Sequence, residues 1–427
     1  MVKIKRVEYS LDHTINTKTP SMLFMLAIVV MSLLLNQSGV VFGVNISFAD
    51  IFCLGIFLSV LYKKELYIPI IPSLFYLIVS AVVLFTAVIY VPIKFEISPG
   101  PIRIISDYIK LIAIFVYFIV GYNLSKLGFT QTIIKWYSIF GVFLGGLGVL
   151  FTVFHLSIFS NLLYFAGTRY KGLMIDPNYF SVLNISALAY VSRIKAIKNR
   201  YKIFIIFITF LSVLSAGSKT GMITFFCYFV LRIIEYLFLT KKKMFSVILQ
   251  LLFITFFILF IPIFISKFSE VISYLSVHFP SFSRVEYLFT DFGSAISESG
   301  SGRDDTWKVA IQIIQLSPLI GVGIGTYTDI AYEMFQYNNV AHNTFLQLSA
   351  EWGLPLAFFF FSYLLFTIGK VTFSNKQSSP RNLILRDIIV VLLIGSVSIS
   401  LNNARVLWIF LGAMLFSLDG KKMKAET

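Results

Sequence analysis

Five residues of the 427-residue sequence have side chains suited to a strongly anionic substrate: Arg169, Lys171, Lys219, Arg303 and His342. The guanidinium group of arginine binds phosphate oxygens through two parallel hydrogen bonds. Histidine, with an ordinary pKa of about 6.5, is mostly neutral at pH 7 and can accept a proton. Together these residue types predict binding of an anion combined with acid–base chemistry.

Two of these cations lie just before a predicted helix start. Asp176 offers an acceptor for the first free N–H groups of a helix, and Pro177 has no N–H to leave unpaired. Capping accounts for Asp176 and Pro177 but gives no role to Arg169 and Lys171. Because a helix N-terminus is itself partly positive, two further cations beside it indicate a bound anion.

The segment 267–352 is too long for a plain connection, and loops of this size are usually functional. A stretch rich in Gly and Ser at 293–302 predicts a flexible lid or hinge. Arg303 then begins a predicted helix with one apolar face, which ends at Ser317 and Pro318. We expect this helix to lie on the outer membrane surface or to cap the bundle.

His342 precedes a stripe of polar residues. Asn343, Gln347 and Glu351 are spaced by four, so their side chains share one face of a helix. A polar stripe at the rim of a membrane is costly unless it faces protein or a water-filled cavity. A lone histidine is more often structural than functional, and the adjacent stripe is what favours a chemical role for His342.

Lys219 lies in a tight turn at 215–221, between two apolar segments, where no cation is needed. Its side chain could simply reach the membrane interface. The turn is not a Walker A loop, because that motif requires glycine directly before lysine. The glycines from Gly321 to Gly325 imitate a dinucleotide-binding loop, but they follow a predicted helix rather than a strand, which excludes that interpretation.

Composition places these residues in an integral membrane protein. Hydrophobic residues make up 58% of the chain and charged residues only 13%, and the mean hydropathy is +0.86. Soluble domains have about 25% charged residues, and a disordered chain would not carry 17% aromatic residues. The expected fold class is all-α, a polytopic helical bundle in the membrane with a long outer loop that contains short helices.

About twelve segments are long and apolar enough to cross a bilayer, which takes roughly 20 residues. They run near residues 21–37, 46–62, 68–92, 104–123, 133–156, 177–193, 202–217, 219–239, 244–266, 353–369, 384–401 and 404–418. The basic residues before the first segment resemble a signal peptide, but no small-residue cleavage site follows, so we expect an uncleaved span.

The predicted spans divide the chain into three parts. Residues 1–266 form an N-terminal transmembrane bundle, residues 267–352 form the outer loop that carries His342, and residues 353–427 form the last spans and a cytoplasmic tail.

The basic residues also predict the orientation. With the N-terminus in the cytoplasm, 23 of the 35 Lys and Arg residues fall in cytoplasmic segments and ten in outer segments. Cytoplasmic loops collect these residues, so both termini are expected inside and the candidate site on the outer face. The same preference for Lys and Arg in cytoplasmic loops, which lie beside anionic lipid, accounts for the basic patches at 193–202 and 241–243. The net charge of +15 therefore does not require a nucleic-acid partner.

Other kinds of site are not indicated. Cys53 and Cys227 lie in apolar segments and predict neither a disulfide framework nor a metal cluster. No outer His or Cys cluster suits zinc, and no paired carboxylates suit a glycosidase. Asp107 and Lys110 lie within a predicted span and could pair with each other. We expect no metal and no cofactor.

Three stretches resemble the bacterial O-antigen ligases and the related O-antigen and capsule polymerases. They are Arg169 to Asn178, Gly217 to Gly221, and Arg303 to Gly353, which includes the Gly321–Gly325 stretch and His342-Asn343. The resemblance covers roughly the C-terminal 60% of the chain, and it rests on the combination and order of the stretches.

The resemblance implies a bacterial inner-membrane glycosyltransferase, independent of metal and active on the outer face. Its donor would be a glycan on undecaprenyl diphosphate, and its acceptor a lipid-linked glycan, lipid A core or another envelope molecule. The resemblance implies His342 as the base and Arg303 as the catalytic diphosphate ligand and, more loosely, Arg169 and Lys219 as further diphosphate ligands. Beside these residues we expect Lys171 as another diphosphate ligand, with Asn343, Asn178 and Gln347 in support.

One departure from the ligase pattern favours a polymerase. Ligases commonly continue from His-Asn to a Gly-x-x-Gly motif, but here Gly353-Leu354-Pro355 is followed by Leu356. The expected activity is polymerisation of O-antigen or capsular repeat units, with a ligase acting on lipid A core as the alternative. A single displacement assisted by His342 predicts inversion at the anomeric carbon.

Two transport functions fit part of the pattern. A flippase for lipid-linked glycans would place its cations along a path through the membrane, rather than at outer helix ends. A small-solute transporter would need more ionisable residues deep in the spans.

Overall fold

The computed structural model describes residues 21–38, 47–156, 159–238, 244–290, 303–373 and 379–423. The predicted hinge at 293–302 and the basic residues at 1–18 and 241–243 lie outside the described residues. The elements are α1 (Met22–Leu34), α2 (Phe48–Tyr62), α3 (Ile70–Phe85), η1 (Thr86–Tyr90), α4 (Val91–Phe95), α5 (Pro101–Lys126), α6 (Thr130–Val153), α7 (Ser160–Leu163), β1 (Tyr164–Phe165), β2 (Arg169–Tyr170), α8 (Pro177–Arg193), α9 (Asn199–Ser215), α10 (Lys219–Phe238), α11 (Met244–His278), α12 (Pro280–Thr290), α14 (Arg303–Leu316), α15 (Tyr327–Phe335), α16 (Thr344–Trp352), α17 (Leu354–Thr372), α18 (Pro380–Gly395) and α19 (Arg405–Met423).

The structure supports a helical membrane protein but not the predicted count of about twelve spans. A helix coincides with each predicted segment. Among the described residues, however, only five helices are long and apolar enough to cross a membrane: Ile70–Phe95, Pro101–Lys126, Thr130–Val153, Lys219–Leu237 and Leu354–Thr372. Several of the other helices are shorter: α1, with 13 residues, falls short of the roughly 20 that a bilayer requires.

The outer surfaces of these long helices are apolar. Ile70 and Leu74 of α3 are 70% and 54% exposed, and Phe358 and Phe366 of α17 are 68% and 58% exposed. Large exposed apolar surfaces are rare on soluble monomers and favourable against hydrocarbon. The helices therefore present a lipid-compatible surface.

Glycines bring the helices of the bundle into close contact. A Cβ atom on Gly121 of α5 would lie 2.0 Å from the carbonyl oxygen of Ile409 in α19, and one on Gly412 of α19 would lie 2.0 Å from that of Phe118. On α6, a Cβ on Gly148 would meet the Tyr170 ring at 2.5 Å. Small residues are thus required where α5 meets α19 and where α6 meets β2.

Two helices end elsewhere than the spans predicted for them. The helix predicted to end at 266 continues as α11 to His278, and the helix predicted to end at 401 stops at Gly395. Residues 396–404 form a connection instead, and the backbone of this connection is hydrogen-bonded to the start of α16. The carbonyl oxygen of Ser396 accepts from the backbone N–H of Thr344, and the carbonyl oxygen of Ile399 accepts from the Thr344 hydroxyl.

The prediction for Arg193 also needs correction. It was assigned to a lipid-facing basic patch, but its side chain is 8% exposed and lies 2.6 Å from both Glu235 and Asp387. Arg386 joins the same carboxylates. Burial of a guanidinium requires such pairing, so Arg193 ties α8 to α10 and α18 instead of binding lipid.

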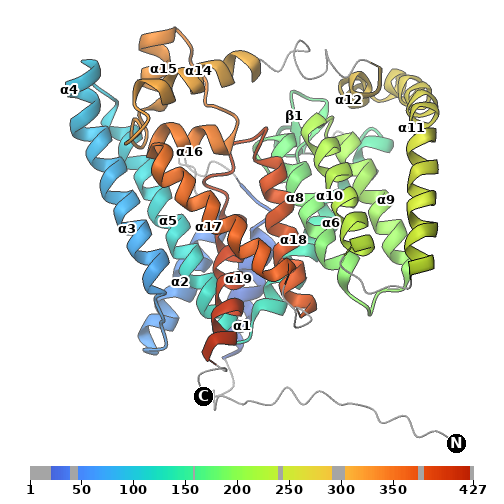
Figure 1. Ribbon diagram of the computed structural model, residues 1–427, viewed down its shortest axis with the longest axis horizontal. Helices are drawn as coiled ribbons and strands as arrows, with labels where there is room; N and C mark the ends of the chain where they lie inside the picture. The colour runs from blue at the N-terminus through green and yellow to red at the C-terminus, as the bar shows by residue number, and fades with distance from the viewer. Residues whose placement is uncertain are drawn as a thin grey trace, which may run out of the picture.

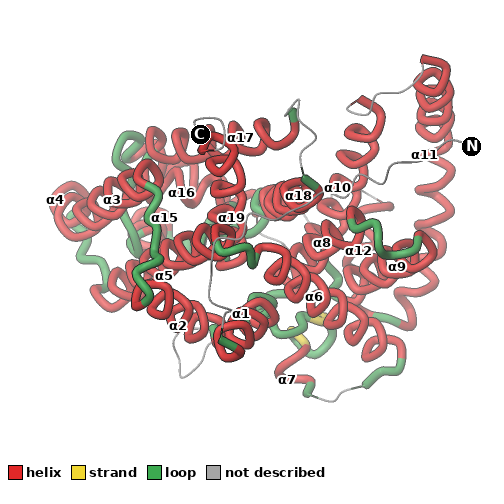
Figure 2. Tube along the Cα trace, turned by 90° about the horizontal axis from the view of Figure 1, so that it is seen from below, coloured by secondary structure: helices red, strands yellow, loops and turns green. Residues whose placement is uncertain are grey.

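Both views place α3 and α11 at opposite edges of the molecule (Figures 1 and 2). Figure 1 shows α12, α14 and α15 together at one end of the bundle, the end that also holds β1. We call this the α14 end, and the predicted site residues lie there.

The Gly121 contact makes a testable prediction. Gly121→Ala should lower the midpoint of thermal unfolding in detergent micelles, because overpacking costs about 1–3 kcal/mol. Gly369→Ala is the matched control, since its Cβ would meet nothing within 4 Å and alanine favours a helix by about 1 kcal/mol over glycine. Equal midpoints of thermal unfolding for the two variants would contradict the close contact of α5 and α19.

Candidate functional site

Arg169 is a buried cation held by polar groups from two other segments. It lies in β2, is 7% exposed, and donates from Nε to the carbonyl oxygen of Ala216 at 3.0 Å. Its Nη2 donates to Oδ1 of Asn178 at 3.3 Å. The same Asn178 oxygen accepts from the hydroxyl of Ser218 at 2.9 Å. Arg169 therefore joins the start of α8 to the turn before α10.

The start of α8 agrees with the sequence prediction. The Asp176 carboxylate accepts from the backbone N–H groups of Asn178 and Tyr179 at 2.8 and 3.0 Å, and Pro177 is the first helical residue. Capping leaves the charge of Asp176 in place, beside the cations of this region.

The turn that carries Lys219 is pressed against α12. Gly217 has φ of +55°, and a Cβ there would lie 2.6 Å from the carbonyl oxygen of Ser281. The ammonium of Lys219 lies 5.8 Å from the centre of the Tyr287 ring, also in α12. This contact brings Arg284 of α12 into electrostatic range of Lys219.

Arg303 reaches the same turn from the first residue of α14. Its Nη2 donates at 3.0 Å to the hydroxyl of Thr220, the residue that follows Lys219 in the chain. The helix ends at Leu316, as predicted from Ser317 and Pro318.

Four cations from four elements gather at the α14 end. They are Arg169, Lys219, Arg284 and Arg303, which we call the cation cluster.

His342 lies beside the cation cluster in the loop before α16. Its backbone is left-handed, with φ of +46°, and its side chain keeps an exposed face. A residue with a Cβ pays about 1–2 kcal/mol for this conformation. Such strain persists only where surrounding structure fixes it, and it clusters at functional sites.

Neighbouring side chains hold the loop on both sides of His342. The Gln347 side chain accepts from the backbone N–H of Ala341 at 3.0 Å and donates to Glu351 at 2.5 Å. Asn343 caps α16 by accepting from the N–H groups of Phe345 and Leu346 at 2.9 and 3.1 Å. The predicted polar stripe therefore makes hydrogen bonds within the protein and fixes the backbone around His342.

Thr344 ties this loop to the connection 396–404. Its hydroxyl donates to the carbonyl oxygen of Ile399 at 2.8 Å and accepts from the N–H of Leu401 at 2.7 Å. The loop is thereby anchored to the segment between α18 and α19, an anchor that the sequence did not reveal.

Electrostatics connect His342 with the cluster. Burial lowers the pKa of His342, the Asp176 carboxylate acts in the opposite direction, and Arg303 adds to the lowering. Burial and the charge of Arg284 lower the pKa of Arg169 to about 10, with Asp176 opposing. Burial also lowers the pKa of Arg303, which Asp176 opposes and Arg284 reinforces. Burial, reinforced by the charge of Arg303, thus favours the neutral imidazole of His342 at pH 7.

The structure brings together most, but not all, of the predicted site residues. Arg169, Lys219, Arg303 and His342 share one region, Asn178 bonds to Arg169, and Asn343 and Gln347 hold the His342 loop. Lys171 follows β2, where its backbone N–H donates to Leu163 at 2.8 Å. In the described residues no contact of its side chain with the cluster is seen.

Sequence reasoning missed Arg284. It was counted as an outer cation, but nothing in its spacing showed that α12 would fold back over the turn at 217. The signal that the sequence offered was Gly217 itself, since a glycine in a tight turn admits a neighbouring backbone, here that of Ser281.

Fold and site together define a helical membrane protein with a cationic site at the ends of its helices. Residues 204–361 match the model of the family described as O-antigen ligase, which confirms the resemblance to O-antigen ligases and polymerases. This stretch is a little over a third of the chain and contains Lys219, Arg284, Arg303 and His342. Neither the curated proteins nor the solved structures compared with the chain gave a match.

The family supports a function of the O-antigen ligase and polymerase type, in a glycosyltransferase-like enzyme of polysaccharide biosynthesis. Lipid-linked glycans and their acceptors are the partners that such a function involves in general. The described residues contain no group of three or more His, Cys, Asp or Glu placed to hold a metal ion.

The charges around His342 make a prediction about its protonation. Diethyl pyrocarbonate modifies neutral imidazole, so the modification rate of the His342 peptide against pH should have its midpoint below 6.5. Asp176→Asn removes a negative charge and should lower the midpoint further, whereas Arg303→Gln should raise it. Asp305 is an exposed carboxylate paired with Lys308, so Asp305→Asn should leave the midpoint unchanged. A midpoint insensitive to both Asp176 and Arg303 would contradict this geometry.

Proposed function

We propose that the protein transfers a glycan from undecaprenyl diphosphate to a hydroxyl group of an acceptor sugar, acting as a polymerase of O-antigen or capsular repeat units. The observation that carries this proposal is the cation cluster beside a neutral, strained His342. A diphosphate suits a cluster of four cations in which, among the described residues, the Asp176 carboxylate acts on Arg169 and Arg303.

In this mechanism, His342 accepts the proton of the acceptor hydroxyl. The hydroxyl oxygen forms a bond to the anomeric carbon of the donor, and the bond from that carbon to the diphosphate oxygen breaks. The lowered pKa of His342 keeps the imidazole in the form that a base requires. One displacement on one face inverts the anomeric configuration.

The cation cluster would stabilise the leaving diphosphate. Negative charge grows on the diphosphate as the bond breaks, and fixed cations are most effective where charge develops. Arg303 is linked to the turn through Thr220 and Arg169 through Ala216, so their guanidinium groups are already positioned. In this scheme guanidinium and ammonium groups neutralise the diphosphate, and no metal ion takes part.

The family description favours a second candidate, an O-antigen ligase that transfers the glycan to lipid A core or another envelope acceptor. Leu356, where ligases commonly have glycine, supports the polymerase. Leu356 lies in the first turn of α17 and packs against the bundle core.

A flippase is the less suitable interpretation. The cation cluster lies at the α14 end, and the buried cations at Arg193 and Arg386 are already paired with Glu235 and Asp387. We place the cluster on the outer face of a bacterial inner membrane, with both termini in the cytoplasm, as the distribution of Lys and Arg predicts.

Loss of the base should stop transfer without loss of donor binding. In lipid bilayers supplied with undecaprenyl-diphosphate repeat units, His342→Ala should slow glycan transfer by about 10²–10⁴-fold. His278→Ala, which removes the imidazole at the end of α11, should keep the wild-type rate. Full transfer by His342→Ala, or a product with retained anomeric configuration, would exclude the mechanism.

Arg303 should be sensitive even to lysine. Arg303→Lys keeps the charge but loses the planar pair of donors, so transfer should fall by about tenfold or more, given the strength of hydrogen bonds to charged groups. Arg200→Lys, at an exposed position, serves as the control. Undiminished activity of Arg303→Lys, measured in the same assay, would show that a bidentate contact to diphosphate is not made.

A further inference from the structure

A polar cavity lies next to the candidate site but is not part of the cation cluster. It has a volume of about 300 Å³ and is lined by residues of α5, α16 and the connection 396–404. Val340, two residues before His342, and Ile175, directly before Asp176, belong to its wall. The cavity and the cluster are therefore neighbours across the His342 loop.

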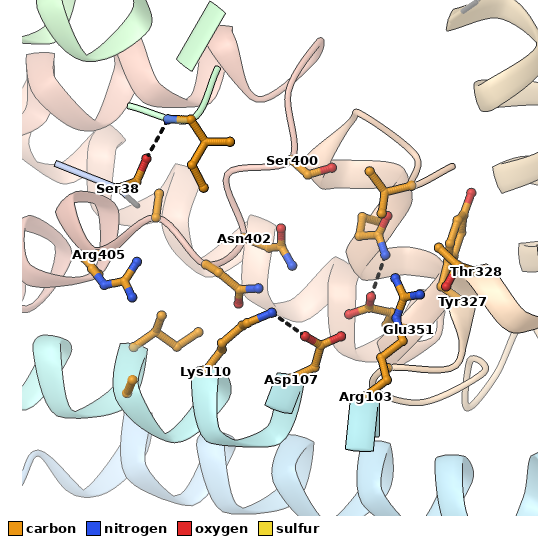
Figure 3. Close-up of a pocket in the computed structure, with 18 of the residues that line it drawn as sticks. Ser38, Arg103, Asp107, Lys110, Tyr327, Thr328, Glu351, Ser400, Asn402 and Arg405 are labelled. Carbon is orange, nitrogen blue, oxygen red and sulfur yellow. Dashed lines mark hydrogen bonds and ion pairs between the residues drawn. The ribbon is translucent and has the colours of Figure 1, made fainter. Parts of the chain in front are cut away.

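The charges in this cavity are nearly balanced. Lys110 pairs with Asp107 at 2.7 Å, as the sequence suggested, and Arg405 pairs with Asp50 at 2.5 Å. Figure 3 shows Arg103 rising from α5 towards Glu351. Burial raises the pKa of Glu351 to about 8, so this carboxyl group is mostly neutral at pH 7 and does not offset Arg103. Because the other two cations are paired, the cavity still carries less excess charge than the cluster.

The remaining polar groups of the cavity are hydroxyls and amides. Asn402, Asn403 and Gln347 line it. So do Tyr327, Thr328 and Ser400, whose buried hydroxyl groups have no hydrogen-bond partner within the described part of the chain. Buried hydroxyls rarely stay unpaired. Paired charges, amides and hydroxyls together offer both donors and acceptors, which is what the hydroxyl groups of a sugar require.

The polar cavity continues into an apolar groove. Asp107, Glu351 and Asn402 also line a narrow neck of about 20 Å³, which shares Leu111 and Trp352 with the groove beyond. The groove has a volume of about 280 Å³ and lies among α3, α5, α17 and α19. Ile114 borders the cavity, the neck and the groove.

The groove opens on the lipid-compatible surface of the bundle. Its walls are almost entirely apolar and include Phe75, Phe115 and Trp408. Two of its residues, Ile71 and Phe359, are 75% and 62% exposed. A hydrocarbon chain could therefore enter from the membrane and reach the neck without passing through water.

We infer that the polar cavity and the apolar groove together bind the acceptor as a glycolipid, with its sugar in the cavity and its hydrocarbon chain in the groove. This inference rests on the proposed function, and it adds where the acceptor lies. The balanced charge suits neutral sugar hydroxyls, whereas the cation cluster suits the diphosphate of the donor. A sugar in the cavity reaches His342 past Val340, so the two substrates meet at the base.

The test uses the full-length protein in lipid bilayers and two probes that act only as acceptors. In one probe the repeat-unit glycan is joined to an undecaprenyl-length chain through an ether bond, which has no leaving group. In the other the same glycan carries a methyl group. The donor is an isotopically labelled glycan on undecaprenyl diphosphate. The wild-type protein should use the long-chain probe with the higher kcat/KM.

Variants separate the two parts of the site. Asn402→Ala should raise the KM for both probes by about tenfold and leave the KM for the donor unchanged. The bond from Trp408 Nε1 to the backbone oxygen of Asn402, 2.7 Å long, is kept in this variant. Val79→Phe, at a position that lines the groove but neither the cavity nor the neck, should abolish only the preference for the long chain. Asn199→Ala and Ile112→Phe, at exposed positions, are the matched controls.

Cross-linking provides a test that does not depend on folding of variants or on turnover. A long-chain probe with a diazirine in its tail should label wild-type peptides from α3, α5, α17 or α19. Labelling of other parts of the protein would overturn the inference. So would an Asn402→Ala variant with an unchanged KM for the acceptor probes, provided that transfer still requires His342. A raised KM for the donor instead would assign the cavity to the donor. Absence of transfer by the wild-type protein would refute the proposed function, and cross-linking would still decide where the glycolipid binds.

Discussion

The repulsion among the four cations of the cluster is the constraint on which the site depends. Arg169, Lys219, Arg284 and Arg303 come from β2, α10, α12 and α14, and the burial of Arg169 removes much of the water that would screen them. Asp176 offsets only part of this charge, and it is already engaged in capping α8. We propose that an anionic ligand supplies negative charge to this arrangement.

The rest of the α14 end can be understood as the frame that resists this repulsion. Arg169 is fixed by Ala216 and Asn178, and Arg303 by Thr220. The His342 loop depends on a separate set of bonds, made by Asn343, Gln347 and Thr344. Because the cations and the histidine are anchored independently, His342 can remain neutral and exposed beside a positive cluster.

The Gly321–Gly325 stretch, which imitates a nucleotide loop, belongs to this frame. The N–H groups of Val322 and Gly323 donate to the carbonyl oxygens of Ala350 and Glu351 at 2.8 and 3.0 Å.

Much of this was predictable from sequence, and the exceptions have physical reasons. Hydropathy located every long helix, capping chemistry located the start of α8, and the spacing of apolar residues located α14. Hydropathy cannot show how far an apolar helix extends, so α11 and α18 end elsewhere than the predicted spans, and the described residues do not support the predicted number of spans. Arg284 and the connection 396–404 were missed because their roles arise from contacts between segments far apart in the chain, such as Gly217 with Ser281 and Thr344 with Ile399. Arg193 was misjudged for the same reason, since its carboxylate partners Glu235 and Asp387 lie on other helices.

The central claim is that the cation cluster binds the diphosphate of a lipid-linked donor. The most direct measurement is an electron cryomicroscopy map of the protein in a lipid nanodisc with undecaprenyl diphosphate bound. Density for the diphosphate among Arg169, Lys219, Arg284 and Arg303, within reach of His342, is the result that this account predicts. Diphosphate density in the polar cavity beside Arg103, or at the opposite end of the bundle, would contradict it.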